Sequence, residues 1–145
     1  MKIKLPMLSL LFLLMISAIN ANKSDVIKSI EKKEESYIAI AKKIWGWAEV
    51  GYQEYKSSEL LQNTLKAEGF TIKSGVADIP TAFVASYGSG EPVIAILAEF
   101  DALPGLSQDI SIIRKPLSDM KAGHACGHHL FGTASVAAAI AVKEW

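Results

Sequence analysis

The sequence has little cysteine, little proline and no excess of charge of either sign. Of its 145 residues, one is cysteine and five are proline, and 15 basic residues balance 15 acidic ones. A single cysteine cannot close an internal disulfide, which excludes a disulfide-stapled mini-domain. Because the charges balance, nothing indicates a nucleic-acid-binding surface, and we expect no nucleic-acid partner. Half of the residues are apolar, which is typical of a globular domain and not of a disordered chain.

The first 21 residues have the pattern of a secretory signal peptide. Two lysines give a positive start, and the apolar run Leu5–Ile19 is followed by small or polar residues. This run falls short of the roughly 20 apolar residues of a membrane-spanning helix, so we expect no stable membrane anchor. The pattern predicts a cleaved signal at 1–21, a mature chain at 22–145, and export to the periplasm or out of the cell.

Three helices are predicted in the mature chain. Apolar residues at spacings of three and four predict one helix from about Asp25 to Trp47 and another from about Tyr55 to Glu68, which ends at Gly69. The alanine-rich segment from Leu130 to Lys143 predicts a third helix, whose small residues allow close packing against a neighbour.

Strand patterns lie between these helices and predict an α/β fold. Short strands are expected at 70–73 and 82–87, and the apolar run Val93–Ala98 is typical of a strand that is buried on both faces. Glu99 and Asp101 follow this run directly. Functional groups gather just past the carboxyl ends of strands in open α/β sheets, although two acids can also simply open a turn.

The stretch Gly123–His129 contains all three histidines and the only cysteine. Thiolate and imidazole are preferred ligands of zinc and related metals, and the neighbouring glycines allow Cys126 and His128 to converge. A structural zinc site needs four protein ligands, and the sequence has no second cysteine–histidine cluster. The residues alone leave three interpretations open: a metal site, a cysteine nucleophile activated by an imidazole, and an inert buried cysteine.

Three stretches carry a family resemblance: Trp47–Glu54, Ala98–Pro104 and Gly123–His129. In this order and spacing they resemble the amidohydrolase branch of the dinuclear zinc metallopeptidase family, whose wider membership includes aminoacylases and carboxypeptidases. The residues of the second and third stretches are most similar to those of the aminobenzoyl-glutamate hydrolases. The similarity extends from about Ser24 to the last residue.

The resemblance implies which residues form the site. Cys126 and His128 correspond to metal ligands of the branch, and Asp101 corresponds to an acid that supports the metal site from beside it. Glu99 stands where the wider family has a metal-binding histidine, so it supplies no imidazole there. His129 is not assigned as a ligand, because many relatives have aspartate at this position.

The resemblance also implies a fold and an activity. The chain would be the N-terminal part of a zinc-exopeptidase-like catalytic domain, a mixed sheet with flanking helices. The lid and dimerisation domain, the catalytic glutamate and the remaining ligands come later in the family and would be missing. Without the rest of the sheet, the run Val93–Ala98 would keep an open apolar face and edge.

The complete protein would then be a metal-dependent amidohydrolase with two divalent ions, zinc or manganese, acting as a homodimer. Its substrate would be an N-acyl amino acid, an aminobenzoyl-glutamate-like conjugate or a short peptide, and the chain alone is expected to be inactive. Two alternatives stay open: a non-catalytic binding protein that retains the fold, and a cysteine-nucleophile hydrolase.

Overall fold

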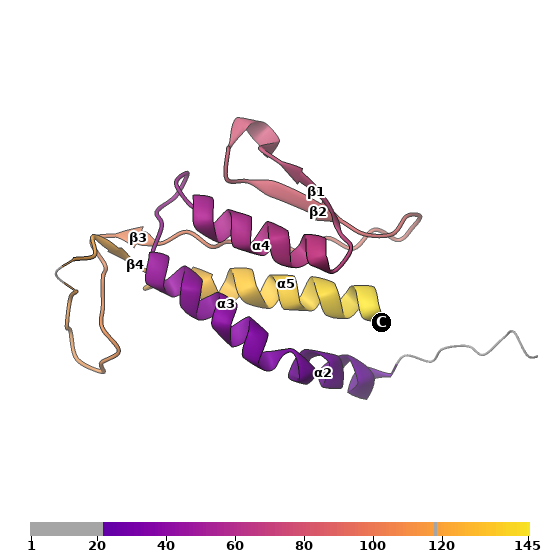
Figure 1. The fold of residues 1–145 in the computed structure, drawn as a ribbon, viewed down its shortest axis with the longest axis horizontal. Coiled ribbons are helices and arrows are strands. Elements are labelled where there is room, and N and C mark those ends of the chain that lie inside the picture. The colour runs from indigo at the N-terminus through magenta and orange to yellow at the C-terminus, as the bar shows by residue number, and fades with distance from the viewer. Residues whose placement is uncertain (1–21, 118) are drawn as a thin grey trace, which may run out of the picture.

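The computed structural model describes residues 22–117 and 119–145, so the predicted signal at 1–21 lies outside the described residues. The elements, in order, are α2 (Lys23–Lys32), α3 (Glu34–Trp47), α4 (Tyr55–Ala67), β1 (Thr71–Ser74), β2 (Phe83–Ser86), β3 (Leu103–Pro104), β4 (Ala122–Gly123) and α5 (His128–Glu144). Helices α3, α4 and α5 lie side by side, the β1–β2 hairpin lies beyond α4, and β3 and β4 lie at the opposite end from the C-terminus (Figure 1). None of the described helices is both long and apolar enough to cross a membrane.

The core lies between the three long helices. Each contributes a stripe of apolar residues at helical spacing, and Ile44, Leu61 and Ile140 are at most 1% exposed. Full burial of such a side chain stabilises the fold by about 1.5–3 kcal/mol. The remaining members of this buried cluster are Ile40, Leu65 and Val136. The packing of three helices is therefore the main source of stability in the described residues.

The first predicted helix is divided into two, which corrects the single helix expected from Asp25 to Trp47. Lys33 separates α2 from α3, with φ −105° and ψ 7°, outside the helical region. Helix α2 also begins earlier than expected, because the Asn22 side chain accepts hydrogen bonds from the first-turn backbone of the helix. The second and third predicted helices are confirmed as α4 and α5, and Gly69 follows α4 in the left-handed conformation.

An ionic cluster surrounds the break. Lys33 Nζ donates to Glu68 Oε1 at 2.8 Å and to Glu144 Oε1 at 2.7 Å, and Lys143 Nζ donates to Glu68 Oε2 at 3.1 Å. Burial disfavours the charged form of Lys33, but these two carboxylates outweigh it and raise its pKa to about 12. The cluster joins the α2–α3 junction to the C-terminal ends of α4 and α5.

Two small antiparallel sheets take the place of the expected mixed sheet in the described residues. Strands β1 and β2 pair antiparallel with Thr71 opposite Ser86, and β3 pairs antiparallel with β4. One isolated parallel bridge joins Val50 to Ala102. The chain is thus a mixture of helices and short strands, compatible with part of an α/β domain.

The segment Val93–Ala98 is not the buried strand that its apolar run predicted. It has no assigned strand, and Val93 and Leu97 are 82% and 72% exposed. The prediction was wrong because no described strand pairs with this segment, so burial on two faces is not available. The expected open apolar face is confirmed: the segment borders a groove of about 1010 Å³ that β2 also lines.

Candidate metal site

The backbone around Asp101 is fixed by its neighbour Ala102. Ala102 is 2% exposed, and its N–H donates to the Glu49 carbonyl at 2.7 Å beside the parallel bridge to Val50. These contacts attach the residues after Val93–Ala98 to the segment between α3 and α4. The backbone that carries Asp101 is therefore held in place by its contacts with residues 49 and 50.

The Glu49 side chain strengthens this anchor from the other side. Its carboxylate accepts hydrogen bonds from the backbone N–H groups of Lys56 and Ser57 and from the Ser57 hydroxyl, at 2.7–3.0 Å. A carboxylate at these positions satisfies unpaired donors of the first turn of α4 and is favoured by the helix dipole. The stretch Trp47–Glu54 thus has a structural function: it joins α4 to the backbone that presents Asp101.

His128 is the first residue of α5, and both of its ring nitrogens face carboxylates. Gly127 precedes it with φ 81°, a conformation that glycine adopts without strain. Nδ1 of His128 lies 2.8 Å from Asp101 Oδ1, and Nε2 lies 3.0 Å from Glu99 Oε2. The ring is largely buried, with its side chain 17% exposed. The structure therefore brings together the predicted site residues Asp101 and His128, although they are 27 positions apart.

Ligand atoms of Glu99, Asp101 and His128 all lie within 4.8 Å of one another. An imidazole beside carboxylates is a donor set that zinc, manganese and iron accept in proteins. An imidazole whose second nitrogen bonds a carboxylate is also the usual arrangement of a metal-bound histidine. On the chemistry of its donors, the cluster fits a divalent ion.

Cys126 lies apart from this group. Its side chain is exposed, and its sulfur is not among the converging ligand atoms. It occupies the turn just before α5, two residues from His128. The assignment of Cys126 as a metal ligand stays a prediction.

The other two histidines pack against each other and against α3. His124 is 8% exposed, and its Nε2 lies 3.1 Å from the Ile44 carbonyl oxygen. Because a carbonyl oxygen can only accept a hydrogen bond, Nε2 carries the proton. The ring centroids of His124 and His129 are 4.9 Å apart. Burial lowers the pKa of His124, and burial together with the nearby His124 lowers the pKa of His129. Nδ1 of His124 and Nδ1 of His129 are buried without a hydrogen-bond partner among the described residues, whereas both ring nitrogens of His128 lie beside acids.

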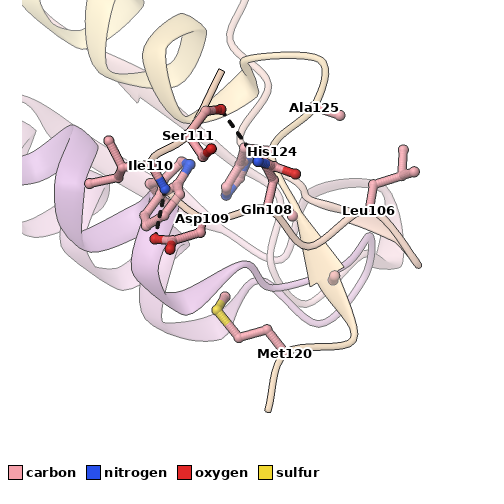
Figure 2. A pocket seen from close by; sticks show the side chains of 11 residues that line it. Leu106, Gln108, Asp109, Ile110, Ser111, Met120, His124 and Ala125 are labelled. Carbon is pink, nitrogen blue, oxygen red and sulfur yellow. Dashed lines mark hydrogen bonds between the residues drawn. The ribbon is translucent and has the colours of Figure 1, made fainter. Parts of the chain in front are cut away.

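A pocket of about 380 Å³ opens beside the motif. Figure 2 shows its lining residues: Asp109 and Ser111 of the preceding loop lie to the left, Ala125 lies to the right, and His124 and Gln108 lie close together between them. Gln108 Nε2 donates to the Ser111 carbonyl, a contact that shapes the loop. The pocket is therefore built from the loop between β3 and β4 and from the backbone that leads to Cys126.

Glu99 is the member of the cluster that sequence reasoning left without a role. Its position was noted because an acid there replaces an imidazole of the wider family, and because it follows an apolar run. The signal that would have identified it is the alternation of Glu99, Phe100 and Asp101. In an extended backbone, residues two apart point to the same side, so both acids can meet one partner.

Comparison with characterised proteins gives a consistent family. The chain is 47% identical over 118 residues to one subunit of the p-aminobenzoyl-glutamate hydrolase of Escherichia coli, covering 81% of this chain and 24% of that protein. It is 34% identical over 102 residues to thermostable carboxypeptidase 1 of Saccharolobus solfataricus, covering 68% of this chain and 25% of that enzyme. It is 32% identical over 120 residues to IAA-amino acid hydrolase ILR1-like 5 of Arabidopsis thaliana, covering 80% of this chain and 27% of that protein.

The chain belongs to the same amidohydrolase and carboxypeptidase family as these relatives. No family model matches it. The resemblance of the three stretches to this family is thereby confirmed. The chain spans about a quarter of the length of the relatives it matches, and it contains both carboxylates and the histidine of the candidate site.

Proposed function

We propose that the chain is part of a metal-dependent hydrolase that cleaves an amide bond in an N-acyl amino acid, an aminobenzoyl-glutamate-like conjugate or a short peptide. The observation that carries this proposal is the convergence of His128 with Glu99 and Asp101 at the N-terminus of α5. The names of the relatives support the reaction class, since they are a p-aminobenzoyl-glutamate hydrolase, a carboxypeptidase and an IAA-amino acid hydrolase.

Each residue has a distinct role in this proposal. His128 binds a divalent ion through one ring nitrogen, and Asp101 accepts a hydrogen bond from the other and fixes the orientation of the ring. Cys126 supplies a thiolate ligand from the turn before α5. An ion held by these residues would supply a Lewis acid for the amide carbonyl and for a water molecule.

The complete centre and the assembly are part of the same proposal. We expect two zinc or manganese ions, further ligands and a general-base glutamate from outside the matched quarter of the relatives, and a homodimer. The chain alone then has no hydrolytic activity. The loop that lines the pocket beside His124 is the part of this chain that we expect to approach the substrate.

The test compares metal content and amide hydrolysis in four forms of the complete protein: wild type, Cys126→Ser, His128→Ala and Asp101→Asn. We expect metal loss with Cys126→Ser and His128→Ala. Asp101→Asn should keep the metal and lose activity about 10–100-fold, as outer partners of metal ligands do. Glu59→Gln on the exposed side of α4 is the matched control, with no change expected.

Three outcomes would contradict parts of the proposal. Full metal and full activity in Cys126→Ser would remove this residue from the site. Loss of hydrolysis in Cys126→Ser with all metal retained would instead support a cysteine nucleophile. Substrate binding without hydrolysis by the complete wild-type protein would favour the non-catalytic binding protein.

Export is a separate proposal that depends on residues 1–21. Their signal-peptide pattern supports a mature protein that begins near Asn22 and lies outside the cytoplasm. N-terminal sequencing of the protein from its own host tests this. A cytoplasmic product that retains Met1 would contradict it.

A further inference from the structure

The imidazole of His128 lies between two carboxylates. Its Nδ1 is 2.8 Å from Asp101 Oδ1, and its Nε2 is 3.0 Å from Glu99 Oε2. With Asp101 as the partner of Nδ1, the Glu99 carboxylate lies on the side of the ring where an ion bound to Nε2 would lie. An ion at that position would meet both Nε2 and the Glu99 oxygen.

We propose that Glu99 is a metal ligand, and that its carboxylate and His128 Nε2 bind the same divalent ion while Asp101 stays outside the coordination sphere. The inference rests on the proposed function, because it adds a ligand to the same metal site. It differs from the sequence-based assignment, in which Cys126 and His128 were the only ligands of this chain. Asp101 keeps its role as the partner that fixes His128 Nδ1.

The separation of the two donor atoms suits a shared ion. Metal bonds from imidazole nitrogen and carboxylate oxygen are about 2.0–2.2 Å long, so adjacent ligands at about 90° lie about 3.0 Å apart. The observed distance from Nε2 to Oε2 is 3.0 Å. Tetrahedral ligands would lie about 3.4 Å apart by the same calculation. The two atoms are therefore already about as close as two adjacent ligands of one ion, without rearrangement of the backbone.

The backbone of Glu99 is held close to α5, whereas its carboxylate is accessible. A methyl group at Gly132 would lie 2.9 Å from the Glu99 carbonyl oxygen and 3.1 Å from Phe100 Cβ, so the two segments are in direct contact there. The Phe100 ring stacks on Phe83 with centroids 6.1 Å apart. The Glu99 side chain is 48% exposed, so an ion can enter from solvent and find the carboxylate already beside Nε2.

Oxygen ligation also affects which ion is preferred. Carboxylates favour harder ions such as manganese, whereas thiolates favour softer ions such as zinc. In this proposal a manganese ion has an oxygen ligand from Glu99 and an adjacent nitrogen ligand from His128. Removal of this oxygen should therefore weaken manganese binding more than zinc binding.

The experiment measures metal binding by the complete protein without substrate, using calorimetric titration with Mn²⁺ alone and with Zn²⁺ alone. The variants are Glu99→Gln, which keeps the shape and removes the charge, Glu99→His, which offers a different ligand atom, and His128→Ala. Glu59→Gln is again the control for loss of one exposed carboxylate. Circular dichroism of each metal-free variant checks that it is folded.

Loss of a residue that only hydrogen-bonds a metal ligand weakens metal binding by up to roughly 100-fold. We expect Glu99→Gln to weaken Mn²⁺ binding by more than this. Its effect on Zn²⁺ should be smaller, and Glu99→His should recover Zn²⁺ binding. A residue that merely pairs with His128 would not be rescued by histidine, because two imidazoles do not form an ion pair. In ¹⁵N spectra of the wild type, Zn²⁺ should shift the His128 Nε2 resonance, whereas Nδ1 keeps its proton.

Two results would overturn the proposal. If Glu99→Gln binds both ions as the wild type does while His128→Ala loses them, Glu99 is not a ligand, and the metal-dependent function stands. If the wild type binds neither ion, both this inference and the proposed function fail.

Discussion

Apolar side chains have opposite surroundings in two parts of the chain. In the helical layer, Leu61 on α4 is fully buried between α3 and α5, whereas Leu97 in the segment Val93–Ala98 is 72% exposed. Helices can bury one another within one short chain, because the apolar stripe of one helix needs only the apolar stripe of a neighbouring helix to cover it. An extended segment needs partners on two edges and two faces. The apolar pattern of the helices therefore leads to burial in this chain, whereas the apolar run Val93–Ala98 stays largely exposed.

The candidate site lies at the boundary between these two parts. His128 comes from the covered helix α5, whereas Glu99 and Asp101 follow the open segment. Ser135 Oγ of α5 donates to the Leu97 carbonyl at 2.7 Å, and Gly132 lies against the Glu99 carbonyl. The spacing of the donor atoms therefore depends on how well the open segment stays attached to α5.

The largest expected effect contrasts the same substitution in the two parts. Leu61→Ala should lower the free energy of unfolding by about 2–5 kcal/mol, because it leaves a cavity between three helices. Leu97→Ala should change it by less than about 0.5 kcal/mol, as exposed positions do. Urea unfolding followed by circular dichroism measures both. Equal losses would show that Leu97 is buried in solution and would remove the contrast.

The second prediction concerns the boundary itself. Gly132→Ala should cost about 1–3 kcal/mol, because its methyl group would overlap the Glu99 carbonyl and force the backbone apart. It should also weaken metal binding. Gly46→Ala in α3 is the matched control: nothing lies within 4 Å of the added methyl, and the substitution should stabilise the helix by up to about 1 kcal/mol. If both variants unfold alike, the close approach of Gly132 is not a constraint.

A smaller effect is expected from the ionic cluster that secures the helical layer. Hydrogen bonds from Lys33 lower the pKa values of Glu68 and Glu144, so their contribution is present above about pH 4.5 and is lost on further acidification. Lys33, whose pKa is raised to about 12, contributes below about pH 10.5 and loses its contribution as the pH rises toward 12.

Because the cluster is partly exposed, Glu144→Gln should cost less than about 1 kcal/mol at neutral pH. The difference from wild type should shrink below about pH 4, since the carboxylates are then protonated in both states. Thermal unfolding across a range of about pH 3–11 measures this. A difference that persists unchanged at low pH would mean that Glu144 acts through packing.

The smallest change in unfolding free energy is expected from polar substitution of the open segment. Val93→Ser with Leu97→Ser should leave stability within about 0.5 kcal/mol, because both side chains already face solvent. Self-association should decrease, since exposed apolar patches promote contacts between molecules. Sedimentation velocity over a range of concentrations tests this, with Lys66→Ser on α4 as the control. An unchanged distribution would show that the segment makes no intermolecular contact.

The sequence predicted the local features and missed those that depend on distant partners. Periodicity and Gly69 located α4 because helix repeat and glycine caps are properties of neighbouring residues. The break at Lys33 was not predictable in this way, because its ion-pair partners Glu68 and Glu144 are 35 and 111 positions away. The run Val93–Ala98 was misjudged because apolar character indicates that a segment needs cover and says nothing about whether a partner is present.

The candidate site divides in the same manner. The proximity of Asp101 and His128 agrees with what the family resemblance implied, whereas the pairing of Glu99 with Nε2 needs the three-dimensional arrangement. Histidine clustering alone did not distinguish the three histidines of the motif, whereas in the structure both ring nitrogens of His128 lie beside carboxylates. The carboxylates that face a histidine, and not the number of histidines, therefore define the candidate site.

The pairing of β3 with β4 closes the base of the loop between them. Leu103 lies opposite Gly123, Gly105 N–H donates to the Lys121 carbonyl, and Gly123 packs so closely on the Leu106 backbone that no side chain would fit. Beyond this closure, Ile110 and Ile112 are almost wholly exposed. A protease cut or an inserted epitope near these isoleucines leaves the base of the loop joined. The loop is therefore a position where chain length can change while Asp101 and His128 keep their distance.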